Sequence, residues 1–188
     1  MNMTRREAVI KMAIVMGAST LNLRLIAAEV APAAGSSPPI FSADEIALLD
    51  EIGETIIPAT DVPGAKAAGI GAFIAMMVRD CYVPRDQAAV KEGLQKIAGA
   101  HSARFGSAFV QGKPADRTTL LNELDREIKQ PAPPDATGPH YFKILKELTI
   151  VGYFSSEIGC KQALRFIEVP GRFDGSAPYK KGEHAWFN

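Results

Sequence analysis

Residues 41–58 read FSADEIALLDEIGETIIP, and this stretch indicates the fold class because it carries the signals of an amphipathic helix. Ser42 and Glu45 have the spacing of a capping box, in which each side chain satisfies an amide at the start of the helix. Phe41 and Ile46 are placed as a hydrophobic staple. Apolar residues then recur at intervals of three or four until a proline ends the pattern. We therefore expect a helix with one buried face.

The same helical spacing of apolar residues returns along the chain, and no stretch shows the alternation of a strand. Residues 175–188 have no periodicity at all. The sequence predicts an all-α fold, a small multi-helix domain with an irregular C-terminal extension. The further expected helices cover 70–82, 84–105, 116–129, 141–154 and 156–167, and the expected connectors are 59–69, 106–114 and 130–139.

Length and charge exclude several function classes. The chain has 188 residues, of which 47% are apolar, so one domain with a buried core is expected. Its 21 basic and 21 acidic residues balance. A nucleic-acid-binding protein needs a basic face to displace counterions, and a membrane-surface protein needs a polybasic patch. We expect neither kind of partner.

Residues 1–40 are predicted to be a twin-arginine export signal and linker, which leaves 41–188 as the helical domain. Arg5 and Arg6 precede a mostly apolar run, and small residues and an alanine-rich stretch follow it. That order is typical of a secretory signal, and paired arginines indicate the twin-arginine route. We therefore expect a periplasmic protein. The alternatives are an amphipathic helix or a membrane anchor, but Lys11 and Arg24 interrupt the run that a membrane span requires.

We predict no catalytic, cofactor-binding or metal-binding residue in this chain. Four carboxylates lie in the first helix, where we expect them at its positive end and on its solvated face rather than in a cleft. His101 lies on an apolar stripe and is predicted to be a hydrogen-bonded core residue. The Gly-Ile-Gly run at 69–71 is read as a helix start, not as a nucleotide loop, because no strand precedes it. The carboxylates are Glu45, Asp50, Glu51 and Glu54.

The two cysteines, Cys81 and Cys160, both fall on predicted inward faces. An oxidising compartment permits a disulfide between them. Two free buried thiols are equally compatible with the sequence, since sequence does not give the distance between the sulfur atoms.

Aromatic residues crowd the C-terminal third of the chain. Several of them lie in the irregular tail, where helical packing does not account for them. Aromatic side chains are favoured anchors in protein interfaces. The predicted partner-contact residues are Tyr153, Phe154, Phe173, Tyr179, Trp186 and Phe187.

Two stretches resemble the gluconate 2-dehydrogenase subunit 3 family. One is ETIIPATDVPGAKAAG at 54–69, and the other is LTIVGYFSSEIG at 148–159, followed by VPGRFDG at 169–175. The likeness extends over most of 41–178. One departure is Ser176, where the family pattern leads us to look for a cysteine.

The resemblance implies a small, non-catalytic subunit of a periplasmic dehydrogenase that oxidises a sugar, a sugar acid or a glucoside. It implies a catalytic partner that holds FAD in the glucose–methanol–choline (GMC) oxidoreductase fold. A cytochrome c subunit, with haem c, or an iron–sulfur centre could belong to the wider complex. It also implies that this chain escorts the catalytic subunit through twin-arginine export and stabilises it.

The residues themselves leave two other interpretations open. One is a stand-alone periplasmic helical protein with a binding or structural role. The other is a stand-alone enzyme, which requires an acid–base or nucleophile constellation that the sequence does not show.

Overall fold

A computed structural model of the chain describes residues 39–131, 137–169, 171, 175–178 and 180–187. Within these residues the fold is all-helical, with no strand and one isolated β-bridge. This confirms the predicted fold class. Its α-helices are α2 (Ala43–Ile56), α3 (Ile70–Cys81), α4 (Pro84–Phe105), α5 (Pro114–Glu127) and α6 (Tyr141–Ser155), with a 3-10 turn η2 (Phe109–Gln111) and a π-helical turn η3 (Gly159–Ala163).

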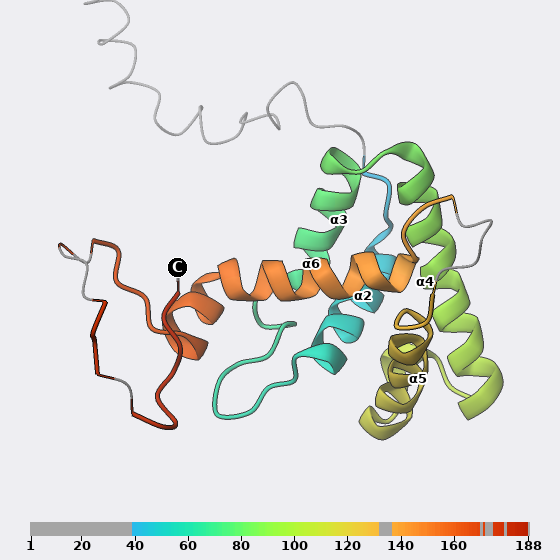
Figure 1. Cartoon of the computed structure of the whole chain (residues 1–188). Helices are drawn as coiled ribbons and strands as arrows, with labels where there is room; N and C mark the ends of the chain where they lie inside the picture. Colours follow the sequence, from blue (N-terminus) through green and yellow to red (C-terminus); the bar gives the residue numbers. More distant parts are fainter. Residues whose placement is uncertain (1–38, 132–136, 170, 172–174, 179, 188) are drawn as a thin grey trace, which may run out of the picture. The chain divides into compact units, whose positions relative to one another are not determined.

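Helix α2 lies among the other helices, and α6 passes across it (Figure 1). Helix α2 contacts each of the other four α-helices. The predicted capping box is present at its start, since the Ser42 backbone amide donates to Glu45 Oε2 at 2.7 Å and the Glu45 amide donates to Ser42 Oγ at 3.2 Å. Leu49 and Ile52 are completely buried at its centre. The helix that decides the fold class in the sequence is therefore also the centre of the packing.

Local sequence explains most helix starts. Pro84 and Pro114 stand in the first turns of α4 and α5, where a missing amide hydrogen leaves no helical bond unmade. Gly69 precedes α3 with a φ of 70°, a left-handed conformation that glycine adopts freely. The run at 69–71 is thus a helix start, as predicted.

The last predicted helix, over 156–167, is wrong in its extent. A short helical segment ends with η3 at Ala163, and Leu164 is already extended. Arg165 then pairs with the C-terminal segment in an isolated parallel bridge to Trp186. The chain leaves the helix early because the backbone groups of Arg165 bond to the tail rather than to the preceding turn.

The predicted signal and linker at 1–40, including Arg5 and Arg6, lie almost wholly outside the described residues and remain a prediction. None of the described helices is long and apolar enough to cross a membrane.

Candidate docking surface

The connector between α2 and α3 is held in one shape by Glu54. Its carboxylate accepts hydrogen bonds from the backbone amides of Ala59 and Lys66, both at 2.9 Å. Gly64 packs directly against that carboxylate, so that an added Cβ would collide with its oxygens. The Ala65 amide also donates to the Ile57 carbonyl oxygen at 2.9 Å. The connector is therefore ordered by its own hydrogen bonds.

Tyr153 ties this connector to α6. Its hydroxyl donates to the Pro63 carbonyl oxygen at 2.8 Å, across 90 positions of sequence. Beside it lies a groove of about 450 Å³ between the connector, the end of α6, η3 and the tail. The groove is lined mainly by apolar residues, with Thr60, Asp61 and His184 as its polar members; the apolar ones are Ile56, Ile57, Pro58, Val62, Tyr153, Phe154 and Ala163.

The C-terminal tail packs on the segment that follows η3. The Arg165 amide donates to the Ala185 carbonyl oxygen at 2.8 Å, and the Phe187 amide donates to the Arg165 carbonyl oxygen at 2.9 Å. The rings of Phe166 and Phe187 meet edge to face with centroids 5.7 Å apart. Residues 164–167 and 183–187 thus form one unit, seen at the C-terminal end of the ribbon in Figure 1.

Large apolar side chains are exposed on this unit and at Val169, two residues beyond its first segment. Trp186 is 47% exposed, Phe187 36% and Val169 79%, and Phe166 and Ile167 are exposed as well. We call these five residues the C-terminal patch. Exposed apolar side chains gathered in one place mark interaction sites, whereas single ones carry no such meaning. On α6, Ile150 and Val151 are also exposed.

The predicted interface residues divide into three groups. Trp186 and Phe187 belong to the C-terminal patch, and Phe154 lines the groove. Tyr153 also lines the groove, but it is only 3% exposed and its hydroxyl is used inside the chain, so its contact with a partner stays a prediction. Phe173 and Tyr179 lie outside the described residues. The sequence does not indicate that Ile167 and Val169 are exposed, because its apolar spacing predicts a helix that runs to Ile167.

The carboxylates of α2 serve as structural contacts rather than as a solvated face. Glu51 is buried and forms ion pairs with Lys66 and Arg117. Burial alone would raise the pKa of Glu51, but the hydrogen bond from Lys66 and the positive charge of Arg117 outweigh it and hold that pKa below its ordinary value. Asp50 Oδ1 accepts from the Gly71 amide at 2.7 Å, at the start of α3. The expected solvated position is therefore wrong for Glu51.

His101 is a core residue, as predicted. It is completely buried, and its Nδ1 lies 2.9 Å from the Ser107 carbonyl oxygen. The Phe105 and Phe109 rings pack beside the imidazole. Among the described residues, no group of histidine, cysteine and carboxylate side chains is arranged to hold a metal ion.

The two cysteines are free thiols. Cys160 is half-buried, and its thiol lies 3.1 Å from the Phe154 carbonyl oxygen. Cys81 is exposed, so its predicted inward position is wrong. It keeps the angular position of the buried stripe of α3 but is the last residue of that helix, beyond the turns that its neighbours cover.

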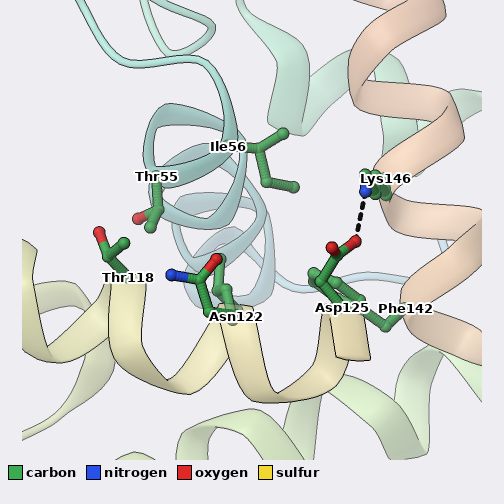
Figure 2. A pocket seen from close by; sticks show the side chains of 8 residues that line it. Thr55, Ile56, Thr118, Asn122, Asp125, Phe142 and Lys146 are labelled. Carbon is green, nitrogen blue, oxygen red and sulfur yellow. Dashed lines mark hydrogen bonds and ion pairs between the residues drawn. The ribbon is translucent and has the colours of Figure 1, made fainter. Parts of the chain in front are cut away.

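A smaller cavity of about 190 Å³ lies between α2, α5 and α6, and Figure 2 shows its lining. Thr118 and Asn122 of α5 face Thr55 of α2, and an ion pair between Asp125 and Lys146 closes one end. Hydrogen bonds from Lys129 and Lys146 lower the pKa of Asp125. The ion pair between Asp125 and Lys146 links α5 to α6 at one end of the cavity.

Comparison with known proteins places this arrangement in a family. Residues 43–171 match the family model described as gluconate 2-dehydrogenase subunit 3. The matched range runs from the start of α2 to just beyond Val169, so it covers the ordered connector, the groove-lining end of α6 and η3. No curated protein and no solved structure gave a significant match. The chain therefore belongs to the gluconate 2-dehydrogenase subunit 3 family, and is by that membership a subunit of a gluconate 2-dehydrogenase-type complex.

Proposed function

We propose that this chain is the non-catalytic small subunit of a periplasmic FAD-dependent dehydrogenase that oxidises a sugar, a sugar acid or a glucoside. It binds a GMC-type catalytic subunit that carries the FAD, accompanies that subunit through twin-arginine export and stabilises it. The family match over 43–171 is the observation that carries the proposal. The wider complex passes electrons onward through a haem c or iron–sulfur subunit.

The C-terminal patch supports a docking role. Aromatic residues, above all tryptophan, are enriched among the residues that dominate binding energy at interfaces. Here Trp186 and Phe187 stand exposed on a segment that the chain itself holds in place. The groove lined by Phe154 and the connector lies next to the same tail, since His184 forms part of its wall. We assign the patch and the groove to contact with the catalytic subunit.

The carboxylates of α2 support a structural rather than catalytic use of the helical domain. Asp50, Glu51 and Glu54 each hold a different part of the fold: the start of α3, the cations Lys66 and Arg117, and the connector. Groups engaged in this way orient the scaffold and are not free to shuttle protons.

Co-expression with the candidate catalytic subunit tests the main claim. We expect a yellow complex in which the flavin spectrum belongs to the larger chain, and we expect the small chain alone to be colourless and inactive. Purification of the small chain as a soluble protein with dehydrogenase activity of its own would contradict the proposal. Failure of the two chains to co-purify would favour the stand-alone binding or structural protein instead.

The escort role is tested by replacing both signal arginines, Arg5→Lys and Arg6→Lys. Because the twin-arginine route reads the arginine pair, we expect the variant chain and its catalytic partner to accumulate together in the cytoplasm. Cell fractionation with flavin detection gives the measurement. Arg24→Lys makes the same chemical change outside the pair and should leave export normal. Export of the partner beside the double variant would refute the escort role.

A further inference from the structure

Arg165 connects to the tail through both of its backbone polar groups. Its amide donates to Ala185 at 2.8 Å, and its carbonyl oxygen accepts from Phe187 at 2.9 Å. These two bonds enclose Trp186 in the single bridge of this region. A bridge of this size has no neighbouring strand to extend it, and short isolated pairings are marginal in water. The backbone alone therefore does not account for the order of the tail.

The Arg165 side chain supplies further contacts to the same five-residue segment. Its guanidinium carbon lies 4.4 Å from the centroid of the Trp186 ring, which is close for a cation–π contact. Its Nη1 pairs with Glu183 Oε2 at 3.0 Å, and both side chains are about one third exposed. Arg165 thus contacts the tail at Glu183 and Trp186 through its side chain, and at Ala185 and Phe187 through its backbone. We call this set of contacts the Arg165 clasp.

The clasp has a consequence for the exposed face of the tail. The Trp186 ring is stacked on one side by Arg165 and stays 47% exposed. Its rotamer is restricted before any partner arrives. An interface side chain that is already ordered loses less conformational entropy on binding, which strengthens association. Phe187 is placed against Phe166 by the same pairing.

We propose that Arg165 is the positioning residue of the docking surface: it holds residues 183–187 so that Trp186 and Phe187 are presented ready-formed to the catalytic subunit. This inference rests on the proposed function, because it takes the catalytic subunit as the partner. It adds that assembly depends on a residue whose own side chain faces the tail and not the partner.

The decisive variant is Arg165→Ala in the full chain, co-expressed with the catalytic subunit. Arg104→Ala is a matched control, because Arg104 also pairs with a carboxylate, Glu123, and also lies over a ring, that of Phe105 at 5.2 Å, but on α4. Loss of the stacking and of the ordering it provides should weaken subunit association about tenfold, measured by dissociation of the complex on dilution. Arg104→Ala should leave the dissociation constant unchanged.

Tryptophan fluorescence gives an independent readout, because Trp186 is the one tryptophan in the sequence. In the full small chain, Arg165→Ala should shift the emission to the red and lower its anisotropy, whereas Arg104→Ala should change neither. Arg165→Lys keeps the charge for Glu183 and the backbone bridge but loses the planar stacking, and we expect it to restore only part of the affinity.

The outcomes separate this inference from the proposed function. Wild-type affinity in Arg165→Ala would overturn the inference, whether or not the fluorescence changes, and the proposed function would stand if removal of the whole tail still weakens assembly. If removal of the whole tail has no effect on assembly, the docking surface itself is wrong. Loss of affinity in Arg165→Ala together with the fluorescence shift supports the positioning role.

Discussion

Glu51 is a buried carboxylate whose negative charge pairs with two cations of the helical domain. It is 7% exposed and bonds to Lys66 from the connector and to Arg117 from α5. Arg117 also donates to the carbonyl oxygens of Gly112 and Val110, at 3.0 and 3.1 Å. Removing the negative charge leaves the largely buried Arg117 cation without its counter-charge. We expect Glu51→Gln to lower the free energy of unfolding by about 2 kcal/mol, measured by urea denaturation.

The pH dependence of that variant follows from the lowered pKa of Glu51. A carboxyl whose pKa is lower in the folded chain stabilises the fold fully above its unfolded value, and that stability is lost as the pH falls through the folded pKa. Below a pH of about 4.5, wild-type stability should therefore fall more steeply than that of Glu51→Gln. Glu92→Gln, at an exposed position on α4, should retain the wild-type slope. Parallel acid profiles for Glu51→Gln and the wild type would contradict this assignment.

Single residues were the hardest features to predict from the sequence. Glu51 reads as a surface carboxylate because its two partners lie 15 and 66 positions away. Tyr153 reads as an available aromatic, but the carbonyl oxygen that binds its hydroxyl is 90 positions away. His101 was predictable because an apolar stripe on its own helix already surrounds it. Periodicity reports on one helix and does not identify a polar partner on another.

At the scale of helices, glycines determine how closely two elements approach. A Cβ added to Gly71 would lie 2.5 Å from the Ile46 carbonyl oxygen, where α3 packs on α2. Gly99 lies within α4 with nothing in reach of an added Cβ. Gly71→Ala should destabilise the domain by about 1 to 3 kcal/mol, because α3 must move away from α2.

Gly99→Ala is the matched substitution, and it should stabilise the domain where Gly71→Ala destabilises it. Alanine in an exposed helix interior is favoured over glycine by about 0.5 to 1 kcal/mol, since glycine loses more backbone entropy on folding. Thermal denaturation followed by circular dichroism compares the two variants. Equal melting temperatures for Gly71→Ala and Gly99→Ala would show that α2 and α3 do not approach as described.

Helix starts were predictable where a local signal exists, as with the capping box at Ser42 and the prolines of α4 and α5. The end of the last helical segment was not. Its apolar residues continue at helical spacing to Ile167, yet the helix ends at Ala163. The deciding interaction is the pairing of Arg165 with the tail about 20 positions later, which no local pattern reports.

At the scale of the whole molecule, the tail contributes to assembly more than to folding. Its described residues are mostly exposed, and the buried core is formed by residues from Phe41 to Tyr153. We expect truncation after Gly175 to change the free energy of unfolding by less than about 1 kcal/mol. Subunit association should weaken about thirtyfold, because one aromatic anchor typically contributes about 2 kcal/mol.

Chemical denaturation of the truncated chain and dissociation of its complex measure the two effects separately. The double substitution Ile150→Ser and Val151→Ser, on the exposed face of α6, serves as a comparison that keeps the tail intact. A truncated chain that unfolds far more easily but still assembles would show that the tail contributes to folding and not to assembly.

The fold class and the family-matching segments were predictable because they depend on local spacing and on contiguous motifs. The docking surface was predictable only in part. Trp186 and Phe187 stand out as aromatics in an aperiodic tail, but the groove joins four separate segments of the chain. A surface made of distant segments has no single stretch of sequence that describes it.

Because α2 is central, its surface is covered by helices that are made at different times during synthesis. α2 leaves the ribosome early, whereas α6, which passes across it, is made near the end. About a hundred residues separate the two, so at about 5 to 20 residues per second the part of α2 that α6 covers is covered roughly 5 to 20 s after α2 itself is completed, whereas α3 can pack on α2 much earlier. Until α6 is made, the nascent chain leaves exposed only the part of the α2 surface that α6 will bury, and α3 can already protect the rest.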